Sequence, residues 1–172
     1  MATLPRPRAL PSVEWRPLRE ADLSYVAALE AQIHAAPWTI GNFRDALAAG
    51  YSACIGNREG RIVVYGVLML APGEAQILNL SVVPDARRQG LGRALLRRFI
   101  DDAMRLGADQ LFLEVRLSNV AAIALYASEG FAGVGRRPAY YPPGAHDGVR
   151  EDALVMRRPA GPVAGDAAGR DH

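Results

Sequence analysis

The run Arg87-Arg88-Gln89-Gly90-Leu91-Gly92-Arg93 lies between an apolar stretch, Gln76–Val83, and an amphipathic stretch, Ala94–Gly107. This arrangement predicts a strand, a turn with two glycines one residue apart, and then a helix. Such a turn leaves backbone N–H groups unpaired at the N-terminus of a helix, where the helix dipole also favours anions. The segment therefore predicts a binding site for a phosphate or pyrophosphate group.

Two familiar phosphate-binding motifs do not fit this run. A Walker A loop needs a Gly-Lys pair, and the chain contains no lysine. A dinucleotide fingerprint needs a third glycine where Leu95 stands, although Glu114 lies near the distance of about twenty residues expected for its acidic partner. What remains is the pattern Gln/Arg-x-x-Gly-x-Gly/Ala, which Arg87, Gly90 and Gly92 fill. Gly-x-Gly before a helix also occurs in ordinary turns. This run alone therefore does not identify the kind of site, and other segments of the chain have to be considered.

Length and composition indicate one globular domain. The chain has 172 residues, of which 50% are hydrophobic and 22% charged, and its formal net charge is +2. Its arginines are spread among the carboxylates and form no stripe of one sign, so we expect no direct nucleic-acid binding. The longest apolar run, Ile62–Ala71, is too short to span a membrane, and residues 1–12 lack the apolar core of a signal peptide. These features predict a cytoplasmic protein without a membrane segment, and they leave the oligomeric state open.

The chain is expected to form a domain over residues 13–158, between a disordered arm at residues 1–12 and a disordered tail at residues 159–172. The order of elements is β-α-α-β-β-β-α-β-α-β-β, which predicts an α/β domain with a mixed, mostly antiparallel central sheet flanked by helices. The expected elements are strands at Val13–Leu18, Tyr51–Asn57, Arg61–Leu70, Ala75–Val83, Leu111–Val115, Phe131–Arg136 and Glu151–Met156, and helices at Glu20–His34, Gly41–Ala49, Leu91–Leu106 and Val120–Glu129.

Three further segments indicate which kind of protein this chain resembles. They are "ILNLSVVPDARRQGLGRALL" (residues 77–96), "LEVRLSNVAAIALYASEGF" (113–131) and "YYPPGAHDGVREDALVM" (140–156), and Pro37-Trp38 precedes them. Together they resemble the GCN5-related N-acetyltransferase (GNAT) superfamily, and most of all its ribosomal-protein-alanine N-acetyltransferase (RimI-type) family. The resemblance covers Val13 to Arg158 and implies the GNAT fold. It also implies acetyl-CoA as co-substrate, no metal, and a protein acceptor, the N-terminal alanine of a small-subunit ribosomal protein.

Two residues are the candidates for catalysis. Glu114 follows Leu111-Phe112-Leu113 in a strand that otherwise reads as buried, where an unpaired carboxylate is costly. An ion pair with Arg116 or another arginine explains this position equally well, but the resemblance implies that Glu114 is the general base. Tyr126, on a helix among alanines, is on its own an ordinary core tyrosine, and the resemblance implies that it protonates the departing thiolate of coenzyme A.

The resemblance also implies which residues bind the cofactor. Asn119 reads as the N-cap of its helix, and by resemblance its side chain also contacts the pantetheine or phosphate region. The other predicted cofactor-binding residues are Leu80, Ser81 and Val82, whose backbone would pair with pantetheine as an added strand does, and Arg88, Gln89, Gly90, Leu91, Gly92 and Arg93, whose backbone N–H groups would hold the pyrophosphate.

The acceptor is expected to bind between two segments, His34–Ile40 and Tyr140–Gly148. Cys54 is expected to be a small buried hydrophobic residue, so no residue is a convincing nucleophile for a covalent intermediate, and we expect direct attack in a ternary complex. His34 and His146 have no neighbours at a metal-binding spacing. The sequence leaves other readings open: another protein N-terminus, a lysine side chain or a small amine as acceptor, a non-catalytic acyl-CoA sensor, or a ribosome-associated interaction module.

Overall fold

The structure of the chain is a computed structural model that describes residues 11–143 and 148–161. The predicted arm at residues 1–12 and the predicted tail at residues 159–172 therefore lie mostly outside the described residues, as do His146 and the tip of the predicted 140–148 loop. Packed structure reaches at least Ala160, which is 1% exposed and donates its backbone N–H to Asp109 O over 3.0 Å.

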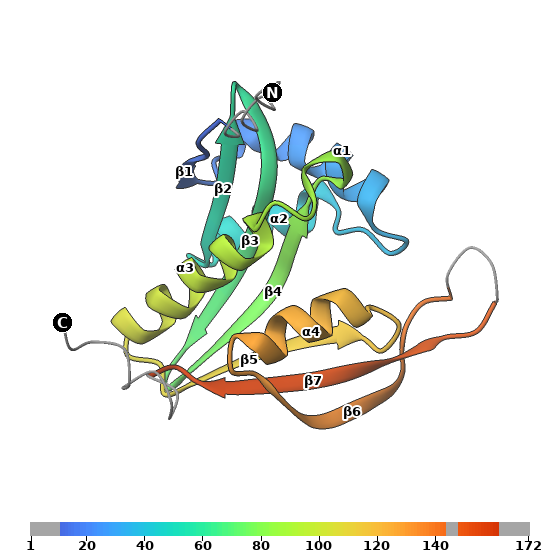
Figure 1. The fold of residues 1–172 in the computed structure, drawn as a ribbon. Helices are drawn as coiled ribbons and strands as arrows, with labels where there is room; N and C mark the ends of the chain where they lie inside the picture. Colours follow the sequence, from blue (N-terminus) through green and yellow to red (C-terminus); the bar gives the residue numbers. More distant parts are fainter. Residues whose placement is uncertain (1–10, 144–147, 162–172) are drawn as a thin grey trace, which may run out of the picture.

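The element order predicted from the sequence is confirmed (Figure 1). In chain order the elements are β1 (Glu14–Pro17), α1 (Leu23–Ile33), α2 (Ile40–Ala48), β2 (Ser52–Arg58), β3 (Arg61–Ala71), β4 (Glu74–Val82), α3 (Leu91–Arg105), β5 (Gln110–Arg116), α4 (Val120–Ser128), β6 (Ala132–Tyr141) and β7 (Glu151–Pro159), with 3-10 turns at Glu20–Asp22 and Pro84–Ala86.

In the described ranges, seven strands form one sheet in the order β1-β2-β3-β4-β5-β7-β6. Neighbouring strands are antiparallel except β4 and β5, which are parallel and are joined by the crossover through α3. Among the described strand residues, only Glu74–Ile77 of β4 and Gln110–Leu113 of β5 form this parallel pairing. Since β4 continues to Val82 and β5 to Arg116, the two strands separate into a fork, which Figure 1 shows between the green and the yellow strand.

Helices cover both faces of this sheet, and each face has its own apolar core. On one face α1 and α2 bury Val26 and Phe43 against Tyr65 of β3. On the other face α3 packs Phe99 onto β3 and β4, and α4 packs Tyr126 beside Leu113 of β5. None of the helices that the structure describes is long and apolar enough to cross a membrane.

The close approach of α3 to β3 depends on a glycine. A Cβ atom at Gly66 would lie 2.6 Å from the backbone O of Asn79 and 2.9 Å from Phe99 Cε2. Real Cβ atoms do not come this close to backbone, so no other residue fits without moving the sheet or the helix. The crossover helix is thereby held tightly against the strands that form the fork.

Caps mark three helix ends, including the predicted Asn119 cap. Thr39 Oγ1 accepts the backbone N–H of Asn42 over 3.2 Å at the start of α2, and Asn119 Oδ1 accepts that of Ala122 over 3.2 Å at the start of α4. Gly107, just beyond α3, has a φ of 83°, as expected for a glycine that ends a helix. The Asn119 cap fixes the start of α4, which borders the site described below.

Three predictions about local structure were wrong in detail. Leu106, the last residue of the predicted helix Leu91–Leu106, lies beyond the end of α3 and is 57% exposed, while Leu96 and Ile100 within the helix are buried. The region Tyr140–Gly148 was expected to be a loop, yet β6 continues to Tyr141, which pairs with Glu151 of β7. Tyrosine favours strands, and β6 is an edge strand that tolerates Pro138. His34, expected inside the first helix, is its C-cap with an extended backbone.

Candidate active site

The fork between β4 and β5 holds a cavity of about 210 Å³. Its walls come from α1 and the segment after it, from β4, β5 and α4, and from Tyr141 at the end of β6. Five of the residues predicted for the site line this cavity together: Leu80, Ser81, Glu114, Asn119 and Tyr126. Residues from three distant parts of the sequence thus share one space.

Glu114 reaches the cavity from β5. Leu113 and Val115 beside it are buried in the core with α3 and α4, so strand alternation turns Glu114 to the opposite face. Its side chain is 12% exposed, and its Oε1 atom forms an ion pair with Arg137 Nε over 2.8 Å. The Tyr140 hydroxyl also bonds this carboxylate, and that bond, together with burial, raises the pKa of Tyr140. Glu114 is therefore both a cavity residue and an ion-paired one, and its arginine partner is Arg137.

Tyr126 approaches the cavity from α4. Its side chain is 8% exposed, and its ring lies 5.9 Å from that of Phe131, measured between centroids. Burial raises the pKa of Tyr126 to about 12. The phenol therefore keeps its proton at neutral pH and is able to donate a hydrogen bond to a group inside the cavity.

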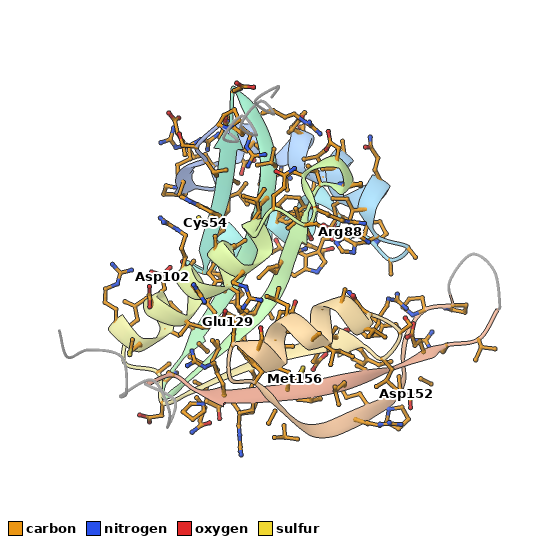
Figure 2. The ribbon with its side chains drawn as sticks, viewed as in Figure 1. Cys54, Arg88, Asp102, Glu129, Asp152 and Met156 are labelled. Carbon is orange, nitrogen blue, oxygen red and sulfur yellow. The ribbon has the colours of Figure 1, made fainter. Side chains whose placement is uncertain are left out.

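The predicted phosphate-binding loop lies beyond the end of β4. Arg88 and Gly90 have φ angles of 62° and 78°, and α3 begins at Leu91. Ala94 N–H donates to Gly90 O over 3.0 Å, which closes the first turn of the helix. The N–H groups of the preceding residues have no acceptor inside the helix, as at any helix N-terminus, so they are free for an anion. Figure 2 shows Arg88 where this loop passes the end of β4.

This loop and the cavity adjoin each other. A Cβ atom at Gly92 would lie 3.6 Å from Val82 and from Leu125 of α4, and 3.8 Å from Leu80. The predicted cofactor-binding residues therefore form one path, from the cavity along the unpaired edge of β4 to the start of α3. Free backbone N–H groups and an open strand edge fit a long ligand with a pyrophosphate and an amide-containing arm, such as coenzyme A.

The side chain of Arg93 does not face this path. It pairs with Glu129 at the end of α4, and its Nη1 donates to Ser128 Oγ over 2.9 Å. Arg97 also pairs with Glu129, over 3.0 Å, and Figure 2 shows Glu129 between α3 and α4. The side chain of Arg93 therefore joins the two helices.

A buried polar network that sequence reasoning missed forms another wall. Glu30 of α1 is 2% exposed and accepts hydrogen bonds from Tyr65 Oη over 2.6 Å and from Asn79 Nδ2 over 3.1 Å. Ser81 Oγ donates to Asn79 Oδ1 over 2.9 Å and lies 2.8 Å from Nε2 of His34. The available signal was position: Glu30 follows Val26 by four residues and so lies on the apolar stripe of the helix, where a charged residue needs partners.

Both segments predicted to border the acceptor contribute residues to the cavity. His34 and Trp38 line the cavity from the segment after α1, and Tyr141 lines it from β6. The guanidinium of Arg116 lies 4.4 Å from the centre of the Tyr141 ring. Burial, followed by the charge of Glu114, raises the pKa of Tyr141 to about 12.

Among the described residues, neither Cys54 nor a metal-binding cluster lies in this cavity. Cys54 lies in a separate hollow between β2 and α3, and burial raises the pKa of its thiol, which makes the thiolate scarcer. Across residues 11–143 and 148–161, no group of three or more His, Cys, Asp or Glu side chains is placed to hold a metal ion.

Comparison with known proteins agrees with this geometry. Residues 12–131 match the model of the acetyltransferase (GNAT) family. The chain is 40% identical over 142 residues to the [ribosomal protein bS18]-alanine N-acetyltransferase of Escherichia coli (strain K12), covering 83% of this chain and 94% of the relative. It is 38% identical over 151 residues to the N-alpha-acetyltransferase RimI of Mycobacterium tuberculosis, covering 84% and 90%. The crystal structure of the ribosomal-protein-S18-alanine N-acetyltransferase from Escherichia coli superposes with a TM-score of 0.81 at 37% identity, covering 90% of this chain and 98% of that one.

Proposed function

Because this chain belongs to the GNAT family and is an acetyl-CoA-dependent N-acetyltransferase, we propose that it acetylates the N-terminal α-amine of a protein. By analogy with the relatives of this chain, the proposed acceptor is an N-terminal alanine of a small-subunit ribosomal protein. The observation that carries the proposal is the fork cavity, because it gathers Glu114, Tyr126 and the edge of β4 next to an anion-binding helix terminus.

The residues that would hold acetyl-CoA lie along the path described above. The N–H groups from Arg88 to Arg93 would bind the pyrophosphate, and the edge of β4 at Leu80, Ser81 and Val82 would pair with the pantetheine amides, with Asn119 beside them. When bound, acetyl-CoA supplies the acetyl group as a thioester. The path ends in the cavity, so the reacting carbon would lie among Glu114, Tyr126 and the acceptor.

Glu114 is proposed as the base. An α-amine has an ordinary pKa of about 7.7–8.0, so roughly a tenth is neutral at pH 7, whereas lysine, at about 10.4, is far more protonated. As the amine nitrogen attacks, it must lose a proton, and Glu114 accepts it directly or through one water. The ion pair with Arg137 orients the carboxylate.

Tyr126 is proposed as the hydrogen-bond donor to the leaving thiolate. A thiol has an ordinary pKa of about 8.5, well below the value of about 12 that burial gives Tyr126. Complete proton transfer from Tyr126 would therefore be uphill, while a hydrogen bond stabilises the developing negative charge without it. Tyr126→Phe should therefore slow turnover without abolishing it.

The biological acceptor is tested by the intact masses of ribosomal proteins from the source cells, with and without this gene. One small-subunit protein that begins with alanine after removal of its methionine should lose one acetyl group in the deleted strain, and a plasmid copy should restore it. Unchanged masses throughout the small subunit would contradict the ribosomal acceptor.

A further inference from the structure

The wall of the cavity formed by α1 and β4 contains an ionisable group to which the mechanism above gives no role. His34 lines the cavity at the end of α1, and its side chain is 41% exposed. Its Nε2 atom lies 2.8 Å from Ser81 Oγ and 3.6 Å from Glu30 Oε2. Because Glu114 lines the same cavity, His34 is placed to meet the same acceptor.

The directions of the hydrogen bonds around His34 follow from Glu30. Tyr65, Asn79 and the backbone N–H of Trp38, at 3.2 Å, all donate to this carboxylate, which only accepts. Asn79 must therefore turn its NH2 group toward Glu30 and its carbonyl oxygen toward Ser81.

The single hydroxyl hydrogen of Ser81 is then used on Asn79 Oδ1. The Ser81 oxygen can only accept from His34, so the hydrogen on the neutral imidazole is on Nε2. Nδ1 is left with its lone pair, and no group among the described residues hydrogen-bonds to it. The network thus selects the tautomer that presents a free base nitrogen.

We propose that Nδ1 of His34 accepts the proton that the α-ammonium group of the acceptor must lose before it can attack, and that Glu30 is a positioning residue acting through Asn79 and Ser81. This inference rests on the proposed function, since it requires an amine acceptor. Two protons leave the nitrogen during acetylation. The first passes to His34 when an N–H bond of the ammonium breaks and its electron pair stays on nitrogen. The second passes to Glu114 as the amide forms.

The exposure of His34 completes the cycle, because the ring can return its proton to water before the next turnover. The other charged or titratable groups around the cavity are Glu30 on α1, Tyr65 on β3, Glu114 and Arg116 on β5, Tyr126 on α4 and Tyr141 on β6. Burial raises the pKa of each of these phenols well above neutrality. Carboxyl and guanidinium groups ordinarily titrate outside the range from about pH 6.5 to 9.5. The acceptor α-amine ordinarily changes its protonation state within this range.

His34→Gln tests the inference. The Gln amide can still donate to Ser81, but its oxygen cannot take up a proton, so the contact remains and the base is lost. We expect kcat/KM for a peptide with a free N-terminal alanine to fall about 10²-fold at pH 6.5. The deficit should shrink at least tenfold by about pH 9.5, where the α-amine is neutral without help. Glu30→Gln should show a smaller deficit with the same narrowing.

The controls separate this inference from the proposed function. Acetyl-CoA affinity and thermal midpoint of His34→Gln should match the wild type. A deficit that is constant across the pH range, or a rise in KM with unchanged kcat, would overturn the role of His34 and leave α-amine acetylation standing. A wild-type enzyme that acetylates no peptide α-amine at any pH would overturn both.

Discussion

At the scale of single residues, Glu114 both lines the cavity and forms an ion pair with Arg137. Glu114→Gln should lower kcat by roughly 10²–10⁴-fold, because the amide cannot accept the proton of the attacking amine. Arg137→Gln removes the same ion pair but keeps the carboxylate of Glu114. Turnover of a short peptide by both variants separates the roles. Equal losses would mean that Glu114 serves structure alone.

Sequence patterns predicted some residues of the candidate site but not the contacts that these residues make. Glu114 stands out because it follows Leu111-Phe112-Leu113 in a strand that otherwise reads as buried, whereas Tyr126 was singled out only through the family resemblance. The ion-pair partner of Glu114 was not predictable, because Arg137 lies on a strand that reaches it only across β7. Glu30 was missed although it lies on the apolar stripe of α1, since its partners come from β3 and β4, 35 and 49 residues further along the chain.

At the scale of elements, the start of α3 should bind phosphate through its backbone. Gly92 has an ordinary helical backbone, and a Cβ there would make only van der Waals contacts at 3.6 Å or more. Gly92→Ala should therefore keep the thermal midpoint yet weaken acetyl-CoA binding by about tenfold or more, because the methyl group would occupy the path beside Leu80 and Val82. Calorimetric titration measures this.

Two companion variants make that test specific. Gly90→Ala should lower the thermal midpoint as well as the affinity, because Gly90 has a φ of 78°, which strains any residue with a Cβ. Arg93→Ala should cost less affinity than either, since its side chain is directed at Glu129. If Arg93→Ala weakened binding most, side-chain charge rather than backbone geometry would hold the phosphates.

The pairing of α3 with α4 should depend on pH. Although its burial opposes ionisation, hydrogen bonds from Arg97 and Arg93 lower the pKa of Glu129 below its usual value of 4.5. A lowered pKa in the folded state adds stability that is complete above the unfolded pKa and is lost as pH falls through the folded one. Glu129→Gln should thus cost about 1 kcal/mol at pH 7, because both arginines are partly exposed and screened.

Denaturant unfolding at several pH values measures this contribution. The difference between wild type and Glu129→Gln should be constant from pH 7 down to about pH 5 and should vanish in stronger acid. A difference that persists below the folded pKa would show that packing, and not charge, accounts for the cost.

At the scale of the whole molecule, element order was the most predictable property, because hydrophobic periods and caps are local. The separation of β4 from β5 was not predictable from either strand, since both continue in strand conformation past the point where they part. This separation arises in the assembled sheet, where α3 packs closely against β3 at Gly66 and β5 continues its pairing with β7. The end of β6 was misjudged for a similar reason, because its pairing with β7 overrides the turn-like sequence around Pro138.

The central claim is that this assembly places a protein α-amine, and not a lysine side chain, beside the base. The most direct test offers the enzyme acetyl-CoA and two short peptides in competition: one has a free N-terminal alanine and no lysine, and the other has a blocked N-terminus and one internal lysine. The enzyme contains no lysine of its own, so lysine acetylation of the chain itself cannot obscure the result. We predict that mass spectrometry will find acetyl groups on the first peptide alone. Equal or faster acetylation of the second would contradict this account of the acceptor.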